Sequence, residues 1–151
     1  MISHGMSYWA VRRVVLDTSV VFSAFRSRRG ASAVLLRLLA LGELAAVATP
    51  SLLLEYEDVL KRPEHLRLSG LSTSGVDAAL EELAALVEPV DVYFHWRPQL
   101  QDPADEHVLE AAINGRADTL VTFNVRDFAN AAPRFGLRVM TAGDLLRELE
   151  P

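Results

Sequence analysis

The chain contains no cysteine, and this absence removes several kinds of chemistry at once. Disulfide bonds, zinc–thiolate sites and thiol nucleophiles are excluded, and nothing indicates an oxidising compartment, so we expect a cytoplasmic protein. Aromatic residues are also scarce: they make up 7% of a chain that is 50% hydrophobic, and Leu, Ala and Val supply most of the remainder. Such a composition favours helices packed on a buried sheet over a β-sandwich.

Long apolar runs are missing as well. Runs such as Leu44–Ala48 fall far short of the roughly 20 residues that a bilayer span needs, and the N-terminus has no signal-peptide core. We therefore expect neither a membrane partner nor export. The length of 151 residues suits one domain. We expect residues 1–13 to form an N-terminal extension and the start of the first strand, and residues 14–151 to form a single domain.

Positive charge is in deficit, with 15 basic against 20 acidic residues and a net charge of −5. This balance at first argues against a nucleic-acid partner. If several of the acids share one metal site, however, the rest of the surface is close to neutral. The clustered basic residues are then candidate phosphate contacts, although ordinary solvated surface charge explains them equally well; they are Arg26, Arg28, Arg29, Lys61, Arg62 and Arg67.

Hydrophobic runs and helix signals alternate along the chain. The first run, Val14–Leu16, has no polar alternation, which is typical of a strand buried on both faces. Alternation of strands and helices implies parallel pairing through right-handed crossovers, and hence a three-layer α/β/α sandwich around a mostly parallel sheet of about five strands. The predicted strands are 14–16, 44–48, 90–93, 120–123 and 138–140; the predicted helices are 30–42, 50–60 after a Thr49 cap, 74–86, 103–114 and 142–149 after a Thr141 cap.

Acidic side chains follow or precede several of the predicted strand ends. In an open parallel sheet the functional crevice lies outside the carboxyl ends of the strands, where the strand order reverses. Asp17 ends the first strand, Asn124 and Asp127 follow the fourth, and Asp102 and Asp105 open the helix before the fourth. Asp17 also has a purely structural interpretation, as an Asx-turn or the cap of a following helix.

Asp105 has the most informative position of these acids. Its helical phase places it near the middle of the apolar stripe of its helix, so its side chain is expected to face inward. Helix capping explains Asp102, which precedes Pro103, and partly explains Asp105 as a first-turn acid. Capping does not explain an inward carboxylate, which is costly when unpaired, so we favour a functional role for Asp105.

The helix at 50–60 offers two candidates, and the pattern does not choose between them. Glu55 and Glu57 flank opposite borders of its apolar stripe, and Asp58 is expected to be solvated. His65, His95 and His107 show no metal-ligand spacing and are predicted to be surface residues.

Carboxylates gathered in one place repel one another, so such a cluster either holds protons at raised pKa or binds a cation. Hard oxygen ligands without His or Cys select Mg²⁺ or Mn²⁺. These ions clamp phosphates and activate water, so phosphodiester hydrolysis is the chemistry that the acids predict.

Four segments, VVLDTSVV (14–21), LLEYEDVL (53–60), DPADEHVLEAAI (102–113) and VTFNVRDF (121–128), resemble the successive blocks of PIN-domain ribonucleases, including toxins of the VapC type. The resemblance extends over residues 14–149. It implies a PIN-like sandwich and metal-dependent cleavage of single-stranded RNA without a nucleophilic side chain. It also implies an acidic, metal-holding quartet of Asp17, Glu55, Asp105 and Asp127, and so selects Glu55 over Glu57.

The same resemblance suggests supporting roles and partners. Asn124 matches a polar position of the family, Asp102 matches an extra acid of one branch, and Ser19 stands where Asn is frequent and would orient Asp17 by a hydrogen bond. Thr18 and Thr122 are expected beside the site. A toxin would have an antitoxin partner that covers or enters the acidic groove, and homodimers are common in the family.

Three other interpretations fit less well. Haloacid-dehalogenase-like phosphotransferases have a second Asp two residues after the first, where this chain has Ser19. Receiver-like signalling modules have a Lys after a late strand, but the single lysine, Lys61, lies in a predicted helix. The strongest rival is a binding module that keeps the fold and has lost catalysis, against which the intact quartet argues.

Overall fold

The computed structural model describes residues 11–93, 100 and 102–150, and its centre is a parallel sheet. The strand order is β3-β2-β1-β4-β5, and each neighbouring pair is parallel. This confirms the predicted α/β fold. The strands are β1 (Arg12–Leu16), β2 (Leu44–Ala48), β3 (Glu88–Pro89), β4 (Thr119–Val121) and β5 (Arg138–Met140).

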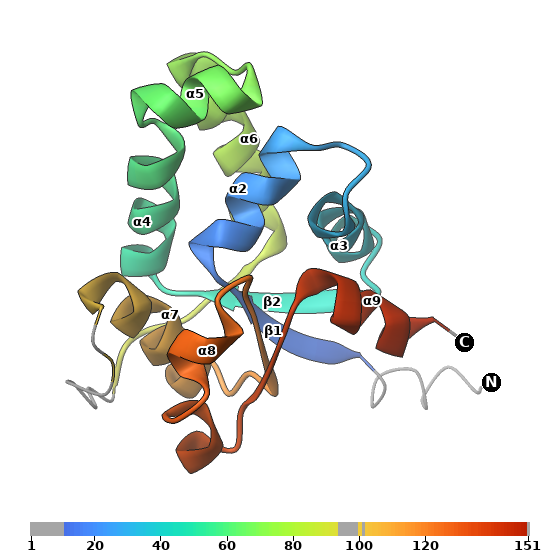
Figure 1. The fold of residues 1–151 in the computed structure, drawn as a ribbon, viewed down its shortest axis with the longest axis vertical. Helices are drawn as coiled ribbons and strands as arrows, with labels where there is room; N and C mark the ends of the chain where they lie inside the picture. The colour runs from blue at the N-terminus through green and yellow to red at the C-terminus, as the bar shows by residue number, and fades with distance from the viewer. Residues whose placement is uncertain (1–10, 94–99, 101, 151) are drawn as a thin grey trace.

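Helices cover both faces of the sheet (Figure 1). One face carries the helices between β1 and β3, and the other carries those between β3 and β5, because the chain reverses its direction across the sheet after β3 and right-handed crossovers then fall on the opposite face. The final helix packs beside α3. The helices are α2 (Thr18–Arg26), α3 (Ala31–Ala40), α4 (Pro50–Leu60), α5 (Pro63–Ser69), α6 (Thr73–Leu86), α7 (Pro103–Asn114), α8 (Val125–Phe128), a 3₁₀ turn η1 (Ala132–Phe135) and α9 (Ala142–Leu149).

The strand order reverses between β1 and β4, the two strands at the middle of the sheet. Val14 and Val15 of β1 are fully buried, so apolar packing on both faces fixes the position of the strand. The polar residues that follow β1 and β4 therefore emerge side by side at the switch point, which is where ligands bind in open parallel sheets.

Helix α4 forms as its sequence predicts. The Thr49 hydroxyl accepts a hydrogen bond of 3.1 Å from the Leu52 backbone N–H, and Pro50 occupies the first turn, where its missing N–H costs nothing. The side chain of Thr141 caps α9 in the same way through Asp144.

Several elements differ from the prediction. The third strand is Glu88–Pro89 and not 90–93, because the ladder with β2 ends at Ala48 paired with Pro89; Pro89 is tolerated since β3 lies at the sheet edge. Helices α2, α5 and α8 and the 3₁₀ turn η1 were not predicted. Pro63, which follows α4, is the first-turn residue of α5.

Helix α7 lies unusually close to the sheet at its C-terminal end. A Cβ on Gly115 would stand 2.7 Å from Val47 Cγ2 and 2.8 Å from the Ala111 carbonyl oxygen, so only glycine fits there. This contact determines the position of α7, the helix that carries Asp105, relative to the sheet.

Among the helices that the structure describes, none combines the length and apolar character needed to cross a membrane.

Candidate metal centre

Asp17 lies at the carboxyl end of β1 and is only 5% exposed. Its position is the N-cap of α2, yet its side chain makes no capping hydrogen bond, so the structural interpretation of this acid is not supported. Its backbone N–H instead continues the sheet by donating to the Val121 carbonyl at 2.9 Å. The carboxylate is therefore buried for a reason other than helix capping.

Two hydroxyl groups hold the Asp17 carboxylate, and both donate to the same oxygen. Ser19 Oγ donates to Oδ2 at 2.8 Å and Thr122 Oγ1 donates to it at 2.6 Å. Each hydroxyl in turn accepts a backbone N–H from the segment after β4: Ser19 from Phe123 at 3.3 Å and Thr122 from Asn124 at 2.9 Å. Within the described part of the chain, Oδ1 receives no hydrogen bond and is left available to a ligand.

Asp105, in the first turn of α7, is half-buried among other acids. Its pKa is raised to about 7, mainly by burial and then, in decreasing order, by the negative charges of Asp17, Asp102, Asp127 and Glu106. Carboxylates that follow β1, open α7 and lie in α8 are therefore close enough for their charges to affect the pKa of Asp105.

The acids line a common pocket of about 460 Å³. Asp17, Glu55, Asp102 and Asp105 contribute to its wall, together with Ser19 and Asn124. Asp127 is exposed in the first turn of α8 and lies outside this lining, although its charge reaches Asp105.

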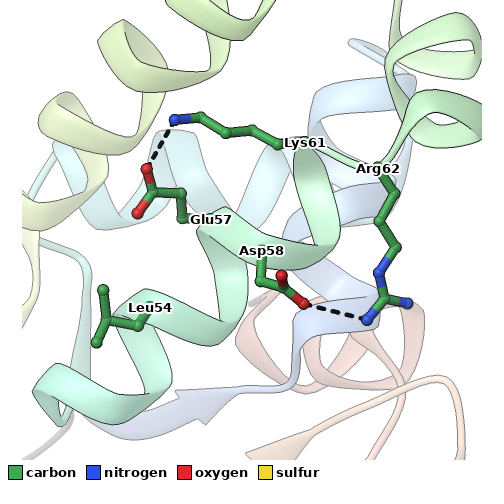
Figure 2. Close-up of a pocket in the computed structure, with 5 residues that line it drawn as sticks. All are labelled: Leu54, Glu57, Asp58, Lys61 and Arg62. Atoms are coloured by element: carbon green, nitrogen blue, oxygen red, sulfur yellow. Dashed lines mark hydrogen bonds and ion pairs between the residues drawn. The ribbon is translucent and has the colours of Figure 1, made fainter.

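Glu55 and Glu57 face different surroundings on α4. Glu55 lines the acidic pocket, whereas Glu57 forms an ion pair with Lys61 at 2.7 Å. Lys61 also pairs with Asp77 of α6 at 2.6 Å, and Figure 2 shows Glu57 and Lys61 extending together toward that helix. The structure thus separates two glutamates that helical phase left equivalent.

The basic residues named from the sequence are divided among several places. Arg62 lies beside the acidic pocket and pairs with Asp58, which is exposed as expected (Figure 2). Lys61 is held between two carboxylates, away from that pocket. The exposed residues Arg26, Arg28, Arg29 and Arg67 do not line it.

His65, which was predicted to be a surface residue, lies in the wall of the acidic pocket. Its side chain is half-buried and lines the acidic pocket next to Phe22. No spacing pattern in the sequence identifies this residue, because α5 itself was not predicted. His95 lies outside the described residues, and His107 is half-buried on α7.

Chemically, the pocket suits a hard divalent cation. Its donors are carboxylate, amide and hydroxyl oxygens, and burial together with the neighbouring carboxylates raises the pKa of Asp105. Among the residues that the structure describes, no three Asp, Glu or His side chains stand close enough to hold one ion together.

The fold and the pocket define the class first: an α/β protein with a carboxylate-rich pocket at the switch point of a parallel sheet. A family model described as PIN domain matches residues 13–126, and the chain belongs to the PIN-domain family. The family resemblance carried by the four sequence segments is thereby confirmed.

Solved structures agree with this assignment at the level of the fold. The chain is similar to a chain in the crystal structure of VapBC2 from Rickettsia felis bound to a DNA fragment from their promoter, with a TM-score of 0.58 and 17% sequence identity. The match covers 84% of this chain and 96% of that one. No curated protein is significantly similar in sequence.

Proposed function

We propose that this protein is a metal-dependent endoribonuclease that hydrolyses phosphodiester bonds of single-stranded RNA. In this proposal Mg²⁺ or Mn²⁺ is held by Asp17, Glu55, Asp105 and Asp127, with Asp102 and Asn124 as supporting groups. The observation that carries it is the pocket that Asp17, Glu55, Asp102 and Asp105 line together, in which burial and neighbouring acids raise the pKa of Asp105. A divalent cation would remove the repulsion, and membership of the PIN-domain family supports the assignment.

A bound divalent ion would polarise a phosphoryl oxygen and lower the pKa of a water ligand. The chain's own residues prepare for this: Ser19 and Thr122 fix one oxygen of Asp17 and leave the other free. Because both hydroxyls donate to Asp17, neither is poised as a nucleophile, and no cysteine is present. Water is then the attacking group. Asp105 gives up its proton when it contributes to the site.

Single-stranded RNA would reach the pocket past Arg62, which is the nearest of the basic residues. Arg26, Arg28 and Arg29 lie at the exposed end of α2 and in the turn that follows, where they would contact phosphates farther along the strand. Lys61 contributes least to this proposal, since two carboxylates already neutralise it.

The two glutamates of α4 supply a matched test. Glu55→Gln and Asp17→Asn each remove one charge from the pocket while they preserve shape, and we expect both to lower Mn²⁺-dependent cleavage of single-stranded RNA at least 100-fold. Glu57→Gln removes the same charge from the same helix on the side of Lys61, and its cleavage rate should stay within about threefold of wild type. Equal losses in Glu55→Gln and Glu57→Gln would contradict the assigned pocket.

One observation favours a second function, a binding module of the same fold without catalysis. In the described part of the chain no three acidic or histidine side chains converge on one point as they stand. Calorimetric titration with Mn²⁺ separates the two proposals: a nuclease should bind the ion and lose that binding in Asp17→Asn. A wild-type protein that binds no Mn²⁺ and cleaves no RNA supports the module.

We further propose that the protein acts in the cytoplasm as the toxin of a toxin–antitoxin pair. The support is its structural similarity to a chain of the VapBC2 complex. Its partners would then be an antitoxin protein that covers the acidic pocket and, in a homodimer, a second copy of itself. Co-expression with the product of a neighbouring gene, followed by purification of a complex that no longer cleaves RNA, tests the pairing.

A further inference from the structure

The wall of the acidic pocket contains one histidine whose ring is fixed from two sides. His65 Nδ1 lies 2.6 Å from the backbone oxygen of Val59, the last-turn residue of α4 that also lines the pocket. The ring packs on Phe22 of α2, with centroids 4.4 Å apart and planes inclined by 39°. Helices α2, α4 and α5 thus hold this imidazole in place.

The hydrogen bond to Val59 determines which nitrogen carries the proton. A carbonyl oxygen only accepts, so Nδ1 is the donor, and in this tautomer Nε2 is the lone-pair acceptor. No described residue forms a hydrogen bond with Nε2. The pocket therefore has one oriented nitrogen acceptor among its carboxylates.

A metal-ligand role fits this nitrogen poorly. His65 does not join two acids in a group able to hold one ion, as judged over the described residues. A phosphate oxygen is also an unsuitable partner, since two lone pairs would face each other. The natural partner is a hydroxyl group that donates.

We propose that His65 Nε2 accepts a hydrogen bond from the ribose 2′-hydroxyl of the nucleotide bound at the acidic pocket, and so makes the site prefer RNA to DNA. This inference rests on the proposed nuclease function. The carboxylates and their ion would take the phosphate, and the ribose attached to it would lie against the adjoining wall that contains His65. The 2′-hydroxyl is the group by which a protein distinguishes the two nucleic acids at one position.

Two variants of His65 test the contributions of Nδ1 and Nε2 separately. His65→Asn keeps a donor near the position of Nδ1, for the Val59 carbonyl, and removes the acceptor at Nε2. His65→Gln reaches the position of Nε2 and gives up the bond to Val59. Each is assayed for kcat/KM on two oligonucleotides of one sequence, with ribose or 2′-deoxyribose at the cleaved nucleotide.

We expect wild type to favour the ribose substrate about tenfold, as the loss of one hydrogen bond implies. His65→Asn should lower kcat/KM on the ribose substrate about tenfold and leave the 2′-deoxy substrate unchanged, with an unchanged melting temperature. His65→Gln should retain part of the preference. An equal fall on both substrates, or a wild type without preference, overturns the proposal.

The proposed function fails in a different way, when wild type cleaves neither oligonucleotide. Affinities of the same two oligonucleotides, measured by fluorescence anisotropy in Ca²⁺, then still test His65. A wild-type preference for ribose that His65→Asn abolishes supports the contact, and equal affinities overturn it.

Discussion

At the scale of single residues, Thr122 connects two strands at the point where the acids meet. Its hydroxyl is fully buried, donates to Asp17 and accepts the Asn124 N–H. Through this one oxygen the end of β1 and the segment after β4 are held in a fixed relation. The orientation of Asp17 depends on a residue that is not itself acidic.

Thr122→Val should therefore lower both activity and stability. The shape is kept, but Asp17 loses a donor and the Asn124 N–H loses its acceptor, which costs about 1–3 kcal/mol in a buried place. We expect kcat to fall about tenfold, measured on RNA with Mn²⁺, and the free energy of unfolding to fall by that amount in urea denaturation.

Thr119→Val is the matched control. Thr119 is a buried threonine at the other end of β4, where its hydroxyl bonds Asp118 and Arg12. Its replacement should cost stability without a change in kcat at equal folded concentration. A similar kcat loss in both variants would show that Thr122 acts only through stability.

At the scale of elements, the close packing of the C-terminal end of α7 against β2 determines the position of Asp105, which lies on the same helix. Gly115→Ala brings a methyl group into Val47 and the Ala111 carbonyl, and both neighbours belong to packed structure. We expect a loss of about 1–3 kcal/mol in unfolding free energy and a drop in cleavage rate, because α7 must shift. Gly143→Ala in α9 meets nothing closer than 3.9 Å and should change neither quantity.

The elements that the sequence predicted well are those with local signals. Helix α4 has a cap and a first-turn proline, and β1 and β2 are short apolar runs. Helix α2 has no such signal: Thr18, Val20 and Val21 are β-branched and disfavour helices, and the segment is helical because its apolar side packs into the core.

The candidate site was predictable to a similar degree. Helical phase placed Asp105 on the inner side of α7, but it left Glu55 and Glu57 equivalent, since both border the same stripe. In the structure they are distinguished by contacts with other elements: Glu55 lines the acidic pocket, whereas Glu57 pairs with Lys61, which also pairs with Asp77 on another helix. His65 could not be found from its spacing, because its role depends on contacts with α2 and α4.

At the scale of the whole molecule, the clustered acids should make global stability depend on pH and on divalent ions. The pKa of Asp105 rises from 3.8 in its ordinary range to about 7 in the fold. Between these values the native state retains a proton that the unfolded chain releases. The contribution of this group to stability is thus lost as pH increases from about 4 to 7.

Asp105→Asn should abolish that loss. In EDTA at pH 8 we expect the variant to be more stable than wild type by about 1 kcal/mol, a value reduced for the partial solvent exposure of the carboxyl, with the difference vanishing near pH 4. Thermal unfolding at both pH values measures it. Adding Mg²⁺ at pH 8 should raise the melting temperature of wild type and not of the variant.

Exposed Asp91 provides the control for general charge effects. Asp91→Asn should follow the wild-type pH profile and respond to Mg²⁺ as wild type does. If Asp105→Asn instead melts below wild type at pH 8 in EDTA, the carboxyl is not under repulsion in the fold.

Tyr56 follows Glu55 on α4 and is buried, and its hydroxyl donates a hydrogen bond of 2.5 Å to the Leu16 carbonyl, one residue before Asp17. Burial, and then the charge of Asp17, raises the pKa of this phenol, so it remains a donor at every pH that the fold survives. This hydrogen bond connects α4, which carries Glu55, to β1, which ends next to Asp17. If the proposed metal ion binds between Asp17 and Glu55, it would meet two carboxylates whose backbone positions folding has already set, so little conformational freedom would remain to be lost on binding.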